Sequence, residues 1–214
     1  MINVNIDSYG DNMKLKVLFE KLVADYTYPK EELEQYRTPP EVALELFNLC
    51  AALANRAKVV VDFCSGTGML LYIFTYLLNR YGVGLELDLD AIKDARRSPL
   101  WRSLLIDYVC CDARKPPLRG KEQYMIISNP PFGTKRKGID KEILKAIISL
   151  NPLGIGLIHY ASEPLLNIIK RFLSNHGYII ERLQKSCMRI KQVYKHHVKK
   201  THVVPLLLIV AVRE

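Results

Sequence analysis

The chain has 214 residues and a formal net charge of +9 at neutral pH, with 49% apolar and 25% charged residues. This length suits one domain with a sizeable core, and the mixture of residues is that of a soluble globular protein rather than a membrane or disordered one. No apolar run approaches the ~20 residues of a membrane-spanning helix, and the positive charge favours an acidic partner such as nucleic acid.

The five cysteines show no Cys-x-x-Cys spacing and no histidine at metal-ligand spacing. Their odd number and the adjacent pair Cys110–Cys111 favour reduced thiols. The first residues have neither a basic start nor an apolar core, so no secretory signal is expected. We therefore expect a cytoplasmic protein without a disulfide or a metal site.

The N-terminal part contains apolar residues at helical spacing. These predict a helix over residues 11–25, a short helical piece over 31–34, and a third helix over 42–54 that starts after Thr38 and two prolines. From residue 58 onward, strand-like and helix-like segments alternate. Strands are expected at 58–63, 82–87, 103–110, 124–128, 154–159, 177–183 and 203–212, and helices at 69–78, 91–97, 139–150 and 165–174.

This alternation predicts an α/β fold with a seven-stranded, mainly parallel sheet and helices on both faces. Because the sequence contains no repeat, low-complexity tract or linker, residues 1–214 are expected to form a single domain.

A glycine turn follows the first expected strand, which ends in Asp62. Its residues are Cys64-Ser65-Gly66-Thr67-Gly68. Two glycines allow a tight turn and close approach of a ligand to the backbone. The turn lacks a full Gly-x-Gly-x-x-Gly and a following Lys-Ser/Thr, so the dinucleotide and P-loop interpretations are weak.

The second expected strand ends in Glu86, about 20 residues past the turn, where a carboxylate can bind both ribose hydroxyls. The next acids, Asp88 and Asp90, are better interpreted as caps of the following helix.

The fourth expected strand leads into Asn129-Pro130-Pro131-Phe132. Two consecutive prolines fix φ and remove two backbone donors, so this segment forms a stiff loop. The loop presents an amide, two carbonyls and an aromatic face, which suit a planar molecule carrying an amino group. A proline-rich turn is the simpler alternative. However, Asp62, Glu86, Asp112 and Asn129 all end strands that meet at one edge of a parallel sheet, and this favours a functional site.

In these features the chain resembles the Rossmann-like class I S-adenosylmethionine-dependent methyltransferases, and specifically their amino-methylating branch. The segments Leu33–Thr38, Asn129–Asp140 and Tyr194–Lys200 look like the methyltransferase-like protein five family. That family methylates N6 of an adenine in small-subunit ribosomal RNA in eukaryotes and archaea. The turn departs from the commoner pattern, because Cys64 and Ser65 stand where Gly and Cys are usual. Glu86 replaces a more usual Asp.

The resemblance implies that the N-terminal helices (1–56) close over the cofactor, that residues 57–214 form the core, and that a small zinc-binding methyltransferase activator subunit is a partner. It places S-adenosylmethionine against Gln35, Tyr36, Thr38, Asp62, Cys64, Gly66, Thr67, Gly68, Glu86, Asp112, Ala113 and Asn129. It assigns catalysis to Asn129, Pro130, Pro131 and Phe132.

RNA is expected to bind two basic segments. Seven Lys/Arg and no acid lie between Arg182 and Lys200, and three more cations follow Phe132. A solvated surface is the simpler explanation, but position favours phosphate contact for part of each segment. The expected contacts are Lys135, Arg136, Lys137, Tyr194, Lys195, His197, Lys199 and Lys200.

Three alternatives stay open at this point. The same loop could hold a glutamine amide of a translation factor, because the chemistry does not separate an amide from an adenine amine. DNA adenine is a further target, disfavoured because no extra recognition domain is present. A non-catalytic RNA-binding scaffold that kept the fold is the third.

Overall fold

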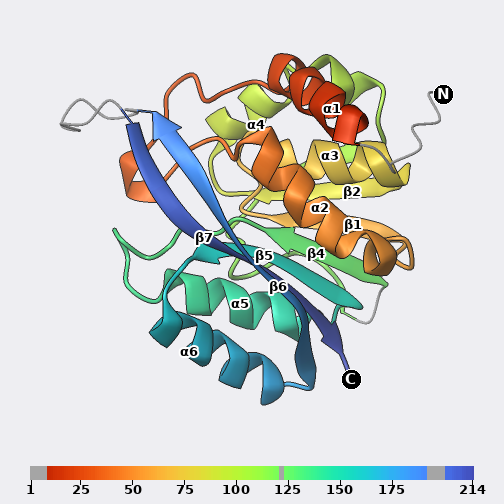
Figure 1. Cartoon of the computed structure of the whole chain (residues 1–214). Coiled ribbons are helices and arrows are strands. Elements are labelled where there is room, and N and C mark those ends of the chain that lie inside the picture. The colour runs from red at the N-terminus through yellow and green to blue at the C-terminus, as the bar shows by residue number, and fades with distance from the viewer. Residues whose placement is uncertain (1–8, 121–122, 192–200) are drawn as a thin grey trace.

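The computed structural model describes residues 9–120, 123–191 and 201–214. Its centre is a seven-stranded sheet in the order β3-β2-β1-β4-β5-β7-β6, in which β7 runs antiparallel to both of its neighbours (Figure 1). The strands are β1 (Val59–Phe63), β2 (Tyr81–Glu86), β3 (Ile106–Cys110), β4 (Tyr124–Ser128), β5 (Gly154–Tyr160), β6 (Tyr178–Lys191) and β7 (Thr201–Arg213). This architecture confirms the predicted α/β fold.

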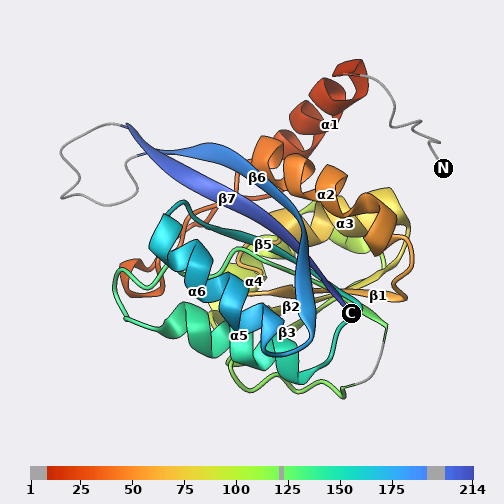
Figure 2. The same cartoon turned by 60° about the horizontal axis from the view of Figure 1, so that its bottom comes forward.

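The helices cover both faces of the sheet, as Figures 1 and 2 show. They are α1 (Tyr9–Leu22), η1 (Glu31–Leu33), α2 (Pro40–Ala54), α3 (Met69–Leu78), α4 (Leu89–Ala95), η2 (Pro99–Arg102), α5 (Ile139–Ser149) and α6 (Glu163–Ser174). None of those in the described ranges is long and apolar enough to cross a membrane.

Two hydrophobic cores lie on opposite faces of the sheet. One packs α1, α2 and α3 against residues such as Val60 of β1, and the other packs α5 and α6 against Val61 and Phe63 of the same strand. This alternation follows from the two-residue period of a strand, which sends successive side chains to opposite faces. Because both faces are covered, the central strands are mostly apolar, with polar residues such as Asp62, Ser128 and His159 near their carboxyl ends.

The strand order indicates at which edge of the sheet a ligand would bind. The chain moves from β1 to β2 and β3 on one side, then to β4 and β5 on the other. In such sheets the crevice outside the carboxyl ends of the strands, at this reversal, is where ligands bind. The register pairs Phe63 at the end of β1 with Ser128 at the end of β4, so the glycine turn and the proline loop begin side by side.

Several predicted boundaries differ from the structure, among them the start of β3, the start of α4 and the end of β6. β3 begins at Ile106 rather than at 103, because residues 99–102 form the turn η2 and Leu104 N donates to the Leu100 carbonyl. α4 begins at Leu89, two residues before the predicted start. β6 continues to Lys191, well past residue 183, because it pairs with β7 along nearly its full length.

Candidate active site

A cavity opens at the carboxyl edge of the sheet, between the strand ends and the segment that precedes α2. Ten of the residues predicted to bind the cofactor line it: Gln35, Tyr36, Thr38, Asp62, Cys64, Thr67, Glu86, Asp112, Ala113 and Asn129. Pro131 also lines it, whereas Gly66, Gly68, Pro130 and Phe132 are not among its described lining residues. The strand ends therefore converge as the sequence predicted.

The glycine turn between β1 and α3 has a left-handed backbone at three positions. Cys64, Gly66 and Gly68 have φ of 58°, 53° and 88°, and Gly68 N donates to the Ser65 carbonyl at 2.8 Å. A Cβ on Gly66 would lie 2.1 Å from the hydroxyl oxygen of Tyr26. Glycine is thus required for both the conformation and the close packing of Tyr26 on the turn.

Asp62 provides a buried carboxylate on the cavity wall. The residue is 1% exposed, and its Oδ2 accepts a hydrogen bond from Leu71 N at 3.1 Å. Within the described residues its Oδ1 has no partner. Burial raises the pKa of Asp62 well above its usual range, because the ionised form loses its hydration. A cationic donor in the cavity would satisfy the free oxygen, and the α-ammonium of S-adenosylmethionine is such a group.

Glu86, at the end of β2, is also buried at the cavity. Its Oε2 accepts from Gly66 N at 2.7 Å and its Oε1 from Asp88 N at 2.9 Å. Burial raises the pKa of Glu86 above its usual value. These backbone bonds hold the carboxylate beside the glycine turn, where the remaining lone pairs of its oxygens can accept hydroxyl donors such as those of a ribose.

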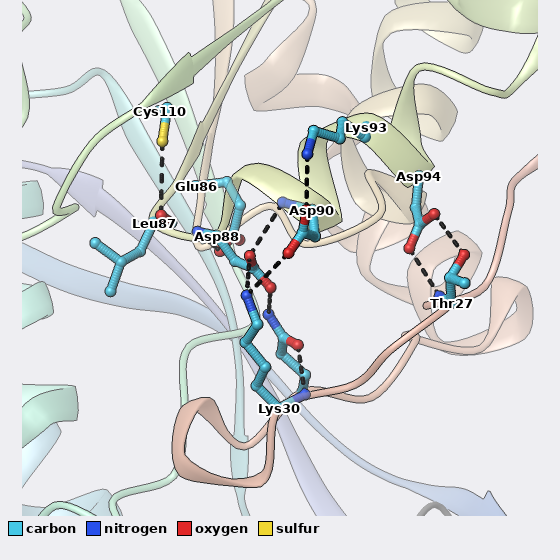
Figure 3. A network of polar contacts seen from close by, with 10 residues as sticks. Thr27, Lys30, Glu86, Leu87, Asp88, Asp90, Lys93, Asp94 and Cys110 are labelled. Carbon is cyan, nitrogen blue, oxygen red and sulfur yellow. Dashed lines mark hydrogen bonds and ion pairs between the residues drawn. The ribbon is translucent and has the colours of Figure 1, made fainter.

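Asp88 caps α4, as predicted, because its side chain accepts from Asp90 N. It also binds the N-terminal segment, which the sequence did not indicate. Lys30 Nζ lies 2.5 Å from Asp88 Oδ1, and Gln35 Nε2 donates to Asp88 Oδ2 at 2.8 Å (Figure 3). Gln35 is thereby held at the cavity wall.

The same segment is attached to α4 at a second point. Thr27 N and Thr27 Oγ1 both donate to the Asp94 carboxylate at 2.7 Å, as Figure 3 shows. Arg97 Nη1 in turn lies 2.9 Å from Asp94 Oδ1. We call residues 26–38 the strap, because they are tied to α4 at both places and contribute Tyr26, Gln35, Tyr36 and Thr38 to the cavity.

Asp112, after β3, lies at the other end of the cavity. Arg114 Nε donates to Asp112 Oδ1 at 2.8 Å, and Arg114 Nη1 lies 3.0 Å from Glu142 Oε2. The guanidinium lowers the pKa of Asp112, so this carboxylate stays ionised. It is 31% exposed at its side chain, and it remains able to accept a hydrogen bond from an adenine amine.

The loop after β4 is held by the strap. Asn129 Nδ2 donates to Thr38 Oγ1 at 3.0 Å, and the Tyr36 hydroxyl donates to Asn129 Oδ1 at 3.3 Å. These two bonds fix the orientation of the Asn129 amide, with its nitrogen toward Thr38 and its oxygen toward Tyr36. Because a carbonyl oxygen has two lone pairs, Asn129 Oδ1 keeps one for a further donor.

Phe132 is held by aromatic contacts. Its ring stacks on His159, with centroids 5.7 Å apart and planes at 25°, and lies 6.1 Å from the Tyr36 ring. His159 is 3% exposed, and its Nε2 is 3.5 Å from Asp140 Oδ2. Pro130 and His159 line a second cavity of about 230 Å³ between α5 and α6. His159 therefore occupies one face of Phe132, and the rings of Tyr36 and Tyr160 also lie close to it.

The predicted RNA-binding residues fall into two groups. Lys135 Nζ forms an ion pair with Glu31, Arg136 Nη2 lies 3.3 Å from Glu142 Oε2, and Lys137 is exposed. All three lie on the loop beside the cavity. Five predicted contacts lie outside the described residues, namely Tyr194, Lys195, His197, Lys199 and Lys200.

Three site residues were missed by sequence reasoning: Tyr26 on the glycine turn, Arg114 on Asp112, and Glu34. Arg114 could have been found, since it follows Asp112 by two residues. Tyr26 and Glu34 carry no local signal, because their partners lie far along the chain.

No protein-family model matches the chain. A Drosophila melanogaster rRNA N(6)-adenosine-methyltransferase, Mettl5, is 33% identical to it over 200 residues, which cover 88% of this chain and 92% of the fly protein. An uncharacterized protein of Methanocaldococcus jannaschii is 26% identical over 190 residues, 84% of each chain. The crystal structure of a Pyrococcus horikoshii protein described as a candidate RNA methyltransferase superposes with a TM-score of 0.84 at 25% identity, covering 94% of this chain and 97% of that one.

Proposed function

This chain belongs to the class I S-adenosylmethionine-dependent RNA methyltransferases, the family of its fly relative, and we propose that it methylates N6 of an adenine in small-subunit ribosomal RNA. The observation that carries the proposal is the fixed orientation of the Asn129 amide. Thr38 and Tyr36 hold it at the cofactor cavity, and Oδ1 keeps a lone pair that can accept from a further donor. The fly relative is named for this reaction.

S-adenosylmethionine, when bound, supplies an activated methyl group. The residues that would hold it are Asp62 toward the ammonium, Glu86 toward the ribose and Asp112 toward the adenine amine, and the free oxygen of Asp62 is consistent with this fit.

The protein's contribution to the reaction is mainly geometric and electrostatic. The lone pair of an adenine amine is delocalised into the ring, which makes the amine a weak nucleophile. Asn129 Oδ1 and the Pro130 carbonyl would each accept a hydrogen bond from one N–H of the amine. The nitrogen would then become more tetrahedral, and its lone pair would become available for attack on the methyl group. The partly exposed ring of Phe132 would stack on the base, a contact worth about 1–3 kcal/mol. The proton leaves the cationic product without a dedicated base.

An adenine in structured RNA must leave its stack to reach this loop. The cations beside the loop, Lys135, Arg136 and Lys137, would meet the phosphates that flank the flipped base. Lys135 and Arg136 are paired with acids in the RNA-free structure, and phosphate would compete for them.

The zinc-binding activator subunit belongs to this proposal as a partner. β3 is an edge strand of the sheet, and Leu105 directly before it is 67% exposed. An edge strand offers unpaired backbone groups to a strand of another protein. Copurification of the activator with the wild-type chain, but not with a variant carrying proline in β3, would support this partner.

The proposal is tested by incubating the chain with labelled cofactor and small-subunit RNA, then digesting the RNA to nucleosides. Label in N6-methyladenosine supports the proposal. A glutamine-containing translation-factor fragment and adenine-containing DNA serve as competing substrates. Label in either of these and none in RNA would contradict it, and no label in any substrate would favour the scaffold alternative.

A further inference from the structure

The carboxylate of Glu34 bridges the strap and the loop that carries Asn129. Phe132 N donates to Glu34 Oε2 at 3.0 Å, and Lys135 N donates to Glu34 Oε1 at 3.0 Å. The two donors are 98 and 101 residues away in the chain. One side chain therefore holds both ends of the turn from Phe132 to Lys135.

The composition of the loop makes this contact important. Pro130 and Pro131 have no N–H, so Phe132 provides the first backbone donor after Asn129. A carboxylate that accepts two amide donors forms charge-assisted hydrogen bonds, which are roughly twice as strong as neutral ones. Glu34 thus supplies the acceptor for the first backbone N–H that follows the two prolines.

The backbone of Glu34 supports the same interpretation. Glu34 has φ of 54°, a left-handed conformation that a non-glycine residue adopts at a cost. Its N–H donates to the Glu31 carbonyl at 3.0 Å, which closes the turn after η1. This turn directs the side chain toward the loop and starts the run from Gln35 to Thr38, which lines the cofactor cavity.

The strap contacts the loop at three successive points. Glu34 holds the Phe132 and Lys135 amides, Tyr36 packs on the Phe132 ring and donates to Asn129, and Thr38 accepts from Asn129. Gln35, between the first two, is bound to Asp88 beside Glu86. The loop that carries Asn129 and the side of the cavity near Glu86 are therefore both attached to residues 34–38.

We infer that Glu34 is a positioning residue, which holds Asn129 and Phe132 in the geometry for methyl transfer. The inference rests on the proposed function only in assuming that methyl transfer takes place at Asn129. It does not depend on which amine receives the methyl group.

The test compares Glu34→Gln with wild type, because glutamine keeps the size and leaves only one oxygen as an acceptor. Glu181→Gln is the matched control, since it removes the same charge from an exposed position of β6. Glu34→Ala gives the full deletion, and thermal unfolding identifies any variant that fails to fold.

Two readouts are expected to change together in Glu34→Gln. Amide hydrogen exchange at Phe132 or at Lys135 should become about tenfold faster or more, because glutamine leaves one of these two donors without its acceptor. The kcat for methyl transfer should fall about 10- to 100-fold, while the Kd for S-adenosylmethionine measured by calorimetry changes by less than about threefold, because Gln35 remains bound to Asp88. Glu181→Gln should match wild type in all three measurements.

Three results would overturn the inference: wild-type kcat in Glu34→Gln, a lowered kcat with unchanged exchange at both amides, or an equal loss in Glu181→Gln. The exchange experiment needs no substrate. If wild type transferred no methyl group to RNA, the proposed function would fail, while exchange at Phe132 and Lys135 would still decide the role of Glu34 in the loop.

Discussion

Asn129 and Thr38 are joined by a 3.0 Å hydrogen bond from Nδ2 to Oγ1, although 91 residues separate them in the sequence. The bond connects the loop after β4 to the strap that covers the cofactor cavity. It also fixes the orientation of the Asn129 amide, because the nitrogen is occupied by Thr38 and the oxygen is left facing Tyr36. The chemistry proposed for this site depends on that orientation.

The first prediction concerns Asn129→Ala. This variant removes the oxygen that would accept the target amine, so methyl transfer to RNA should fall below detection. S-adenosylmethionine affinity should stay largely intact, because Asp62, Glu86 and Asp112 are untouched. Labelled methyl transfer and calorimetry measure the two effects separately. Near-normal turnover by this variant would refute the assignment.

The second prediction concerns Thr38→Val, which keeps the shape of the side chain and removes the acceptor for Asn129 Nδ2. Leaving a buried amide unsatisfied costs roughly 1–3 kcal/mol, and because the Asn129 amide is partly buried, kcat should drop by up to about 100-fold. Thr38→Ser retains the hydroxyl and is expected to stay within about threefold of wild type. Equal activity of the valine and serine variants would show that the bond does not orient the amide.

The third prediction concerns the pH dependence of cofactor binding. Burial raises the pKa of Asp62, so protonation removes its charge at a higher pH than usual. If Asp62 binds the cofactor ammonium, affinity should rise as the pH increases through that raised pKa, by at most tenfold per unit. Asp62→Asn should flatten the profile, as calorimetry across the pH range can test. If Asp62→Asn left the pH profile of cofactor affinity unchanged, Asp62 would not bind the cofactor ammonium.

Without cofactor, the contribution of Asp62 to the free energy of unfolding should instead fall as the pH rises. A carboxyl whose folded-state pKa is raised contributes stability below the unfolded-state pKa of about 4. That contribution is lost as the pH rises through the raised folded-state value. Denaturant unfolding without cofactor should therefore show that Asp62→Asn gains stability relative to wild type at neutral pH.

The fourth prediction concerns Lys135, Arg136 and Lys137. Replacing each by alanine should weaken RNA binding and lower the slope of log affinity against log salt by about 0.7–0.9 per lost phosphate contact. Lys58→Ala is the control, because Lys58 precedes β1 at the opposite edge of the sheet. Filter binding at several salt concentrations measures the slopes. Salt-independent affinity, or equal effects at Lys58, would exclude phosphate contact here.

Sequence patterns predicted the core of the fold well because its strands are buried on both faces and its helices are amphipathic. α3 and β4 match their predicted ranges, and Asp62, Glu86, Asp112 and Asn129 meet at one edge of the sheet. Each of these residues lies at a strand end, and topology alone brings such ends together.

The remaining features depend on long-range contacts that periodicity does not encode. β6 continues past residue 183 because β7 pairs with it, although its outer half carries Lys185 and Arg189 without apolar alternation. The strap is located by Thr27, Lys30 and Gln35, whose acidic partners lie on or just before α4. Glu34 lies within a motif segment, yet nothing near it in the chain indicates Phe132 as its partner.

The central claim is that this chain places a methyl group on an adenine of small-subunit ribosomal RNA. Mass spectrometry of nucleosides from purified small-subunit RNA tests it most directly, in cells with the gene, cells without it, and deleted cells supplied with wild type or Asn129→Ala. We predict that N6-methyladenosine is lost on deletion and restored by wild type alone. Unchanged N6-methyladenosine after deletion, or equal restoration by Asn129→Ala, would contradict the claim.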